Sequence, residues 1–474
     1  MWKLFNDALT DIHNLIWGVP LMALILTGGI FLSIRLRFLQ VKRLPLALKW
    51  VFHNEKNDNG EISSFAALMT ALSATIGTGN IVGVATAVVA GGPGALFWMI
   101  FAAFFGIATK YSEAFLAVRF RDIDPETGRT LGGPFYYIEK GMGSRFKWLA
   151  KLFAFFGVCV GLFGIGTFSQ VNSIVSAVNN FFNPHNISNV HITGIGSYST
   201  LTVVSSIILA SLVALVIIGG LQRISKVASF VVPFMAVLYI FLTCMILILN
   251  IRALPSALVQ IISGAFNPRA VTGGAVGSVF VAMQKGIARG IFSNEAGLGS
   301  APIAAATAQT KEPVRQGLVS MTGTFIDTIV ICNMTGLSLV LTGAWKVPKL
   351  EGVAVTTYAF KKALPFSHQV SAFLLMICLI FFAFTTILGW SFYSERCLAY
   401  LTGGKKTALK IFRWLYIFAV FIGPYMTVKA VWTIADIFNG CMAIPNMIAL
   451  FALSSVTAHE TKKFFDEKKH LTAE

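Results

Sequence analysis

The chain has 474 residues, of which 56% are hydrophobic and only 12% are charged, and its formal net charge is +17 at pH 7. Ordinary soluble domains are about half apolar and about a quarter charged, so this composition excludes a soluble globular protein and indicates a polytopic membrane protein. The cations lie in loops between apolar segments and form no continuous basic face, which argues against nucleic-acid binding.

Eleven apolar stretches are long enough to cross about 30 Å of hydrocarbon. We predict transmembrane helices over residues 15–34, 64–89, 94–118, 151–181, 200–220, 227–250, 274–298, 316–343, 368–393, 409–425 and 430–453. The first stretch lacks a positive n-region and a small-residue cleavage site, so we expect a retained helix and not a signal peptide. An odd number of spans puts the two termini on opposite sides of the membrane.

The distribution of lysine and arginine predicts the orientation. One set of loops, together with the carboxyl-terminal tail, carries 26 of these residues, and the opposite set carries eight. Cytoplasmic loops are enriched in lysine and arginine, so the amino terminus is expected outside and the carboxyl terminus in the cytoplasm.

The helix count also suggests an internal repeat. If residues 1–61 form an extra helix with a basic cytoplasmic linker, ten helices remain, and they divide into five-helix halves over 62–252 and 253–453, followed by a tail at 454–474. Because five is odd, the second half is inverted relative to the first.

The first helix of each half contains a glycine-rich interruption. Residues 73–83 read SATIGTGNIVG, and residues 284–297 mix glycines with charges at membrane depth. Gly77 and Gly79 weaken the helical ladder where no water can replace its hydrogen bonds. Such breaks in corresponding helices indicate a transporter's binding site, and the alternative is a close-packing seam of small residues.

Two motifs carry a resemblance to a known family. GGPGALFWMIFAAFFG at 91–106 and GIARGIFSNEAGLGSAPIAAA at 286–306 resemble the alanine or glycine:cation symporter family, also called the sodium:alanine symporter family. Ile100 and Phe101 depart from the tryptophan and aliphatic residue usual in the first motif. The family is similar to the leucine-transporter fold, which implies an all-α membrane protein of two inverted five-helix repeats with a sodium-coupled site at the midplane.

The resemblance matches Gly77, Thr78, Gly79 and Asn80 to the unwound part of the first core helix. The amides of Thr78 and Gly79 are expected to bind an amino acid's carboxylate, since free backbone amides at a half-helix end attract anions. Asn80 is expected to make a polar substrate contact, and its alternative role is helix capping.

Three further residues belong to the predicted substrate site. Gln170 is matched to a substrate hydrogen bond, with interhelical bonding as the alternative. Trp390 is expected to form a bulky wall that leaves room for a small side chain, with interfacial anchoring as the alternative. Gly290, in the second interrupted helix, completes the set.

The resemblance also implies a sodium site. Adjacent Thr385 and Thr386 match the position that supplies two hydroxyl oxygens, and the carbonyls of Ser73, Ile76 and Phe382 complete the cage. An oxygen cage without a carboxylate suits a monovalent cation better than calcium. The alternative is that each threonine bonds back to its own helix.

Four charged residues at membrane depth require partners, because an unpaired ion there is costly. We hypothesise that Asp327 pairs with Lys285 or Arg289 as a structural or gating contact. Glu295 is expected either to form an inner gate with Arg289 or to cap a restarting helix.

The predicted function is sodium-coupled import of a small neutral amino acid, alanine or glycine, across the bacterial cytoplasmic membrane. No nucleophile, zinc-protease or phosphate-loop motif occurs, so an enzyme is not expected. The expected partners are the amino acid, sodium as co-substrate and the lipid bilayer, with no cofactor, nucleic acid or obligate protein partner. Proton coupling, or a non-concentrating channel or receptor, are the alternatives.

Overall fold

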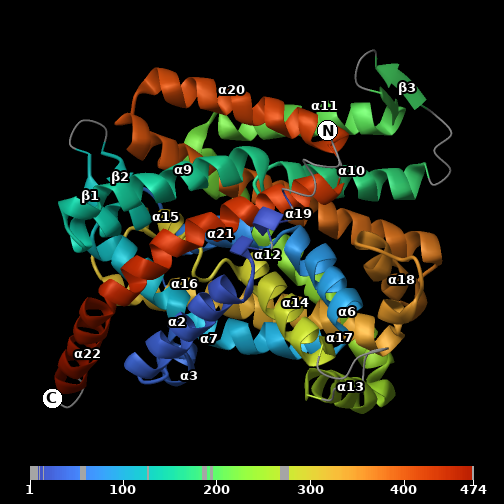
Figure 1. Ribbon diagram of the computed structural model, residues 1–474, viewed down its shortest axis with the longest axis horizontal. Coiled ribbons are helices and arrows are strands. Elements are labelled where there is room, and N and C mark those ends of the chain that lie inside the picture. The colour runs from blue at the N-terminus through green and yellow to red at the C-terminus, as the bar shows by residue number, and fades with distance from the viewer. Residues whose placement is uncertain are drawn as a thin grey trace.

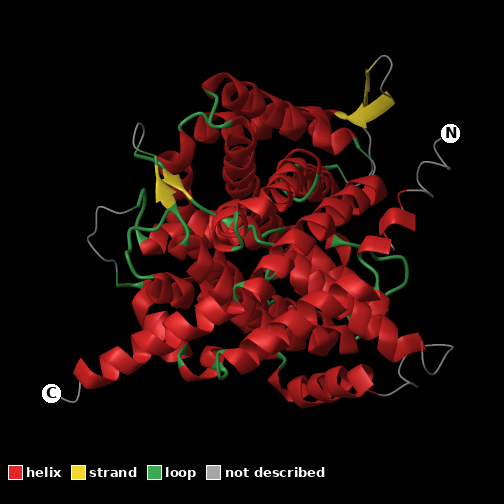
Figure 2. Ribbon diagram, turned by 60° about the vertical axis from the view of Figure 1, so that its left-hand side comes forward, coloured by secondary structure: helices red, strands yellow, loops and turns green. Residues whose placement is uncertain are grey.

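The computed structural model describes residues 9, 11–13, 15–53, 60–124, 128–183, 189–192, 196–266, 277–426 and 428–471. These residues form a mainly helical bundle in which helices distant in sequence lie side by side (Figures 1 and 2). The described strands form two short antiparallel hairpins: β1 (Asp122–Ile123) with β2 (Thr130–Leu131), and β3 (Asn189–Ile192) with β4 (Gly196–Ser199).

Each of the eleven predicted segments is mainly helical where it is described, apart from the breaks reported below; residues 274–276 of the seventh lie outside the described residues. In chain order the segments correspond to α2 (Val19–Arg35); α5 (Ser64–Thr75), η1 (Gly79–Gly83) and α6 (Val84–Gly91); α7 (Gly94–Arg119); α9 (Lys147–Phe163) and α10 (Phe168–Phe182); α11 (Thr200–Ile217); α12 (Gly220–Leu249); α14 (Gly277–Asn294); α16 (Pro313–Thr324), η6 (Phe325–Cys332) and α17 (Asn333–Thr342); α19 (His368–Thr402); α20 (Lys406–Ile422); and α21 (Val428–Ala452).

Shorter helices connect these segments or extend from them. They are α3 (Leu39–Lys42), α4 (Leu44–Val51), α8 (Pro134–Tyr136), η2 (Tyr137–Gly141), η3 (Ser144–Phe146), η4 (Ile251–Ala253), α13 (Leu254–Phe266), α15 (Ala301–Ala305), η7 (Ala344–Lys346), α18 (Val353–Ala363), η8 (Gly423–Tyr425) and α22 (Ser454–Leu471).

The helices identify a multi-pass membrane protein. Among the described residues, eight helices are long and apolar enough to cross a bilayer, and a ninth span results if α5 and the helix after its break count together. The number of eleven spans, the inverted repeat and the proposed domain boundaries stay predictions.

The first core helix is broken where the sequence predicted. Ser63 caps α5 by accepting a hydrogen bond from the Ala66 amide, and the helix ends at Thr75. The chain resumes a helix at Gly79 with a bend of 50°. Gly77 lies in the gap, where a Cβ atom would come within 2.5 Å of the Thr386 hydroxyl, so only glycine allows this close approach.

The second break is displaced from its predicted position. The stretch 284–297 was expected to be interrupted, but α14 runs unbroken to Asn294 and the helix restarts at α15. Glu295, Gly297 and Gly299 between them have φ values of 56°, 92° and 80°. This left-handed backbone ends the helix at its carboxyl end, and the glycines farther upstream do not interrupt it.

The predicted segment 151–181 lies in a single candidate membrane span, but it contains a break. The stretch 151–181 was expected to be a single helix, but α9 ends at Phe163 and α10 begins at Phe168. The carbonyl of Gly166 in the gap accepts a hydrogen bond of 2.8 Å from the Tyr416 hydroxyl, which satisfies backbone that the break leaves without a helical partner.

Candidate functional site

Asn80 lies at the centre of the first break and is fully buried. Its Oδ1 accepts a hydrogen bond of 2.9 Å from the Gly77 amide, and its Nδ2 donates to Asp327 Oδ1 at 2.7 Å. The side chain therefore caps the break and ties it to η6. The sequence analysis gave helix capping as the alternative role of Asn80, and the structure shows that role. Both the donor and the acceptor of its side-chain amide bond to protein groups.

Thr78 and Gln170 connect the break to α10. The Thr78 amide, expected to be free for a carboxylate, donates to Gln170 Oε1 at 3.1 Å. Gln170 thus makes the interhelical bond that was the alternative to substrate binding. Among the residues that the structure describes, the buried hydroxyls of Thr78 and Ser169 have no hydrogen-bond partner. Buried polar atoms normally have partners, so a polar ligand could satisfy these two.

Oxygen atoms from α5 and α19 meet beside the same break. The Thr386 hydroxyl lies 3.3 Å from the Ile76 carbonyl oxygen and 3.1 Å from that of Phe382. The Thr385 hydroxyl lies 3.0 Å from the Phe382 carbonyl oxygen. Both threonines bond back to their own helix, and Thr386 also reaches across to the break.

Ser73 and Gly79 lie on either side of these oxygen atoms. The Ser73 hydroxyl donates to the Thr70 carbonyl of its own helix at 2.8 Å and faces Gly389, one turn beyond Thr386 in α19. A Cβ atom on Gly79 would meet Ser293 in α14 at 3.4 Å, so the first break packs directly on the last turn before the second.

Asp327 is fully buried, and its side-chain hydrogen bonds to described residues are all with uncharged groups. Besides Asn80, its carboxylate accepts hydrogen bonds from the hydroxyls of Ser293 at 3.0 Å and Thr328 at 2.7 Å. The hypothesis of an ion pair with Lys285 or Arg289 was therefore wrong.

The two cations of α14 lie too far along the helix for that pairing. Arg289 and Lys285 precede Ser293 by one and two turns, a displacement of about 6 and 12 Å. Lys285 is exposed. Arg289 lies 3.5 Å from Asp436 in α21 and 5.4 Å from the centre of the Phe292 ring. Asp436 was missed, although a single acidic residue in an apolar helix was a signal for it.

Glu295, at the second break, is hydrogen-bonded to Trp390 of α19. The Trp390 indole donates to Glu295 Oε1 at 2.9 Å, and the Ser300 hydroxyl donates to the other carboxylate oxygen. Trp390 is 1% exposed, which excludes interfacial anchoring. The expected gate between Glu295 and Arg289 was wrong, because the carboxylate points to the restarting helix instead.

Glu113 in α7 is a second carboxylate at this break, and sequence reasoning missed it. Its Oε1 accepts hydrogen bonds from the amides of Gly297 at 3.0 Å and Gly299 at 3.1 Å and from the Asn446 side chain at 2.7 Å. It is the only acidic residue in α7, which was the available signal. Its carboxylate replaces the helical partners that the break removes.

Gly290 lies away from the group around Asn80. A Cβ atom there would come within 3.1 Å of Met99 in α7, so this glycine serves close packing of α14 on α7. The prediction of a substrate contact at Gly290 is not supported by this placement.

A cavity of about 620 Å³ opens beside α6 and leads towards the first break. Its lining is mainly polar or small and comes from α6, α10, α14 and the start of α18: Val82, Thr86, Val89, Ala90, Asn172, Ser173, Ser176, Asn180, Arg289, Glu351, Gly352 and Val353. The residues of the break itself are buried, so the site is accessible from this side only after local movement.

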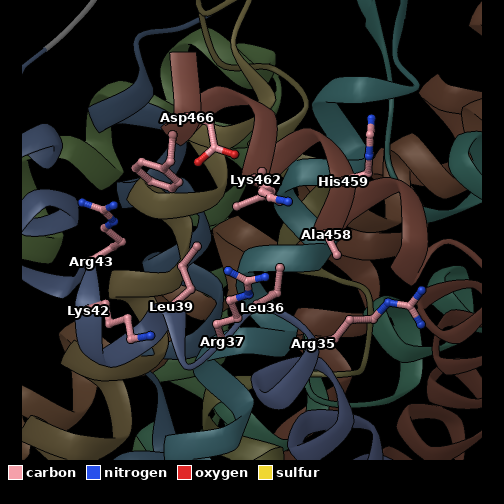
Figure 3. Close-up of a pocket in the computed structure, with 12 residues that line it drawn as sticks. Arg35, Leu36, Arg37, Leu39, Lys42, Arg43, Ala458, His459, Lys462 and Asp466 are labelled. Carbon is pink, nitrogen blue, oxygen red and sulfur yellow. The ribbon is translucent and has the colours of Figure 1, made fainter. Parts of the chain in front are cut away.

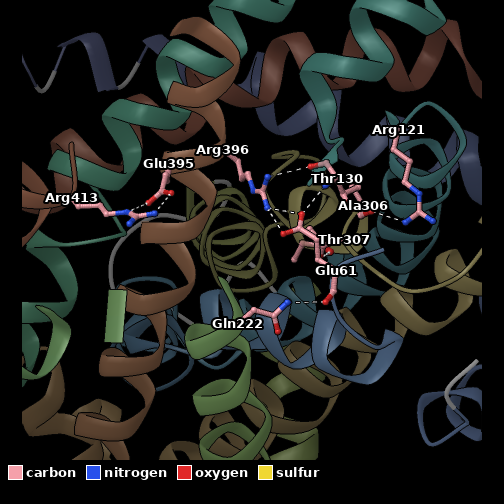
Figure 4. Close-up of polar contacts among 10 residues, drawn as sticks. Glu61, Arg121, Thr130, Gln222, Ala306, Thr307, Glu395, Arg396 and Arg413 are labelled. Carbon is pink, nitrogen blue, oxygen red and sulfur yellow. Dashed lines mark hydrogen bonds and ion pairs between the residues drawn. The ribbon is translucent and has the colours of Figure 1, made fainter. Parts of the chain in front are cut away.

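The opposite end, where α5 begins, is closed by polar contacts (Figure 4). Arg396 of α19 donates to both carboxylate oxygens of Glu61, at 2.6 and 2.9 Å, and to the Thr130 carbonyl at 3.2 Å. Gln222 at the start of α12 donates to the Glu61 carbonyl at 2.9 Å. Figure 4 shows these side chains converging on the chain just before α5.

Broken helices that meet at a buried polar centre, with a cavity at one end and a closure at the other, define a secondary transporter. A family model described as the sodium:alanine symporter family matches residues 2–474, and the chain belongs to that family. It is therefore a cation-coupled amino-acid symporter and not an enzyme.

The chain is similar to several curated transporters along almost its whole length. It is 53% identical over 98% of its length to an uncharacterized transporter of Haemophilus influenzae, covering 97% of that protein. It is 45% identical over 98% of its length to the sodium/alanine symporter AgcS of Methanococcus maripaludis, covering 98% of it. The probable sodium/glutamine symporter GlnT of Bacillus subtilis is 36% identical over 96% of the chain and 90% of its own length.

A solved structure supports the fold. The chain resembles MhsT in complex with L-phenylalanine, with a TM-score of 0.55 and 14% identity, over 83% of this chain and 89% of that one. This similarity identifies the leucine-transporter-like fold.

Proposed function

We propose that this protein imports a small neutral amino acid, alanine or glycine, together with sodium. The observation that carries the proposal is the meeting of the Ile76 and Phe382 carbonyls with the hydroxyls of Thr385 and Thr386 at the first break. These are neutral hard oxygen ligands, suited to a monovalent cation. The names of AgcS and GlnT, which specify sodium, agree with this coupling.

The substrate site is proposed beside Thr78 and Gln170. The Thr78 hydroxyl has no hydrogen-bond partner within the described part of the chain, and the Thr78 amide would become available if Gln170 rotated away. A carboxylate entering here would accept from both groups. Trp390 is fixed by its bond to Glu295 and supplies the wall that favours a small side chain.

The proposed transport cycle uses the cavity at one end of the molecule for entry and the closed end for release. Substrate and sodium enter through the cavity beside α6, and release on the other side requires the contacts of Glu61 with Arg396 to open. One cation moving inward down 100 mV contributes about 2.3 kcal/mol to accumulation.

Proton coupling is the second candidate. Asp327 and Glu295 are buried and form no described hydrogen bond with a lysine or arginine, so either carboxylate could carry a proton. The name of a Bacillus subtilis relative that is 35% identical, the sodium/proton-dependent alanine carrier protein YrbD, includes both ions.

Uptake into proteoliposomes separates the two candidates. Radiolabelled alanine, glycine and glutamine are offered with an inward sodium gradient, an equal potassium gradient or a pH gradient. We expect the inward sodium gradient to drive accumulation of alanine or glycine. Equal accumulation with the pH gradient alone would establish the proton mechanism, and equilibration without concentration would refute coupled transport.

A further inference from the structure

A basic pocket lies where the amino-terminal helix meets the carboxyl-terminal one. Its volume is about 460 Å³, and the α2–α4 region and α22 line its two sides (Figure 3). The charged and polar lining residues are Arg35, Arg37, Lys42, Arg43, His459, Lys462 and Asp466, and the apolar ones are Leu36, Leu39, Ala458 and Phe465, with Thr461 between them. Five cations thus face one carboxylate. None of these residues belongs to the transport site.

Most of this positive charge is not neutralised by the protein. Arg35 donates to the Ser455 hydroxyl at 2.6 Å, and Arg43 stacks 4.1 Å from the centre of the Phe465 ring. Within the described part of the chain, Arg37, Lys42 and Lys462 form neither an ion pair nor a side-chain hydrogen bond. Cations clustered without counter-charges repel one another, so an anion between the two walls would stabilise the arrangement.

The backbone holds the basic turn in a fixed shape. Arg37 and Phe38 have φ values of 55° and 54°, a left-handed conformation that side chains rarely adopt. The turn is fixed by a hydrogen bond of 2.7 Å from the Phe38 amide to the Ser33 carbonyl and by one of 2.8 Å from Gln40 to the Ser33 hydroxyl. The pocket wall is therefore preorganised.

Four exposed apolar side chains, called the apolar rim below, flank the basic residues of the pocket in sequence. Phe31, Ile34, Phe38 and Val41 are 37%, 60%, 41% and 57% exposed on the same stretch of chain. Arg35 ends α2, so the pocket lies at the boundary between hydrocarbon and water if α2 spans the bilayer as predicted. A free anion needs the basic walls only, whereas a lipid with a negatively charged headgroup needs both the walls and the apolar rim.

We propose that this pocket binds an anionic phospholipid, with its headgroup phosphate between the basic turn after α2 and Lys462 of α22, and its acyl chains along Phe31, Ile34 and Val41. The lipid would bridge the two walls of the pocket, which are also joined by the bond of Arg35 to Ser455 and by the stacking of Arg43 on Phe465.

Native mass spectrometry of the purified full chain in detergent tests the proposal with phosphatidylglycerol and phosphatidylcholine as probes. We expect phosphatidylglycerol to bind the unaltered protein at least about tenfold more tightly, since each cation near an anionic surface contributes about fivefold. The variant R37Q/K42Q/K462Q should lose at least about tenfold of this affinity, while Asp466→Asn should tighten binding.

The matched control is K405Q/K406Q/K410Q, which removes the same charge from three exposed lysines at the start of α20. It should change the affinity less than about twofold if the site is local. Equal loss in both triple variants, or equal binding by R37Q/K42Q/K462Q and the unaltered protein, would overturn the proposal. Displacement of the lipid by an equal concentration of glycerol phosphate would also overturn it in favour of a free-anion site.

Discussion

Thr386 is the residue that links α19 to the first break, through its hydroxyl and the Ile76 carbonyl 3.3 Å away. Interactions of polar groups with a charged partner contribute about 1.5–3 kcal/mol, which is about tenfold or more in affinity. Thr386→Ala should therefore raise the sodium concentration for half-maximal alanine uptake at least about tenfold, whereas Thr386→Ser keeps the hydroxyl and should change it only slightly.

Thr402 supplies the matched control for this prediction. It lies at the far end of the same helix, and its hydroxyl bonds back to the Leu398 carbonyl at 2.8 Å. Thr402→Ala should leave the sodium dependence of uptake unchanged. If both alanine variants shift the sodium dependence alike, the oxygen group at Thr386 is not a sodium site.

The pair of Trp390 and Glu295 gives a second prediction at the residue scale. Trp390→Phe removes the indole donor at 2.9 Å and leaves a carboxylate oxygen buried without it, which costs about 1–3 kcal/mol. We expect a lower unfolding temperature in detergent and slower uptake. Glu295→Gln retains an acceptor for the indole and should unfold at a temperature closer to that of the unaltered protein. If the unfolding temperature and the uptake rate of Trp390→Phe are unchanged, the bond between Trp390 and Glu295 contributes neither to stability nor to transport.

At the scale of elements, Glu113 of α7 holds the second break by accepting hydrogen bonds from the Gly297 and Gly299 amides. Glu113→Ala leaves both amides buried without a partner, at a cost of about 1–3 kcal/mol each. The variant should unfold at a clearly lower temperature in a thermal scan, and Glu113→Gln, which keeps an acceptor oxygen, should lose less.

Glu460 provides the control for Glu113, because it bonds to Arg119, the last residue of the same helix, and is partly exposed. Exposed ion pairs contribute about 0–1 kcal/mol, so Glu460→Ala should change the unfolding temperature little. A larger effect at Glu460 than at Glu113 would contradict the assigned role.

The breaks also show how far the sequence predicts this fold. Segment length and apolarity located the long apolar helices, and the paired glycines located the first break. Glycine has two uses with the same local pattern, however: Gly77 permits a break, whereas Gly290 permits close packing on Met99. Periodicity alone cannot distinguish them, so the second break was placed too early and the one between α9 and α10 was missed.

For the candidate site, the sequence predicted which residues gather but not which partners they take. Asn80, Gln170 and Asp327 do lie at the breaks, yet Asn80 bonds to Asp327, Gln170 bonds to the Thr78 amide, and Asp327 does not form the expected pair with Lys285 or Arg289. Such pairings depend on the rotation of each helix about its axis, which a single sequence leaves open. Glu113 shows the same limit, since its partners lie 184 and 186 residues away.

At the scale of the whole molecule, access from the two sides is unequal, with a cavity of about 620 Å³ beside α6 and a closed end before α5. Glu61 and Arg396 are the main charged contact at the closed end, and both side chains are mostly buried. Glu61→Gln should weaken this closure by about 1 kcal/mol, which favours opening about fivefold. A reporter variant, Ala305→Cys, should then react faster with a thiol reagent added at that side.

The exchange of both charges distinguishes a closing contact from a general loss of stability. The double variant Glu61→Arg with Arg396→Glu restores an attractive pair between α19 and the residues before α5, so it should bring the labelling rate of Ala305→Cys back towards that of the reporter alone. Arg413 pairs with Glu395 at 2.6 Å nearby and touches neither Glu61 nor α5, so Arg413→Gln should leave the rate unchanged. If Arg413→Gln accelerates labelling as much as Glu61→Gln, the end before α5 loosens as a whole, and the Glu61–Arg396 contact does not control the release of substrate.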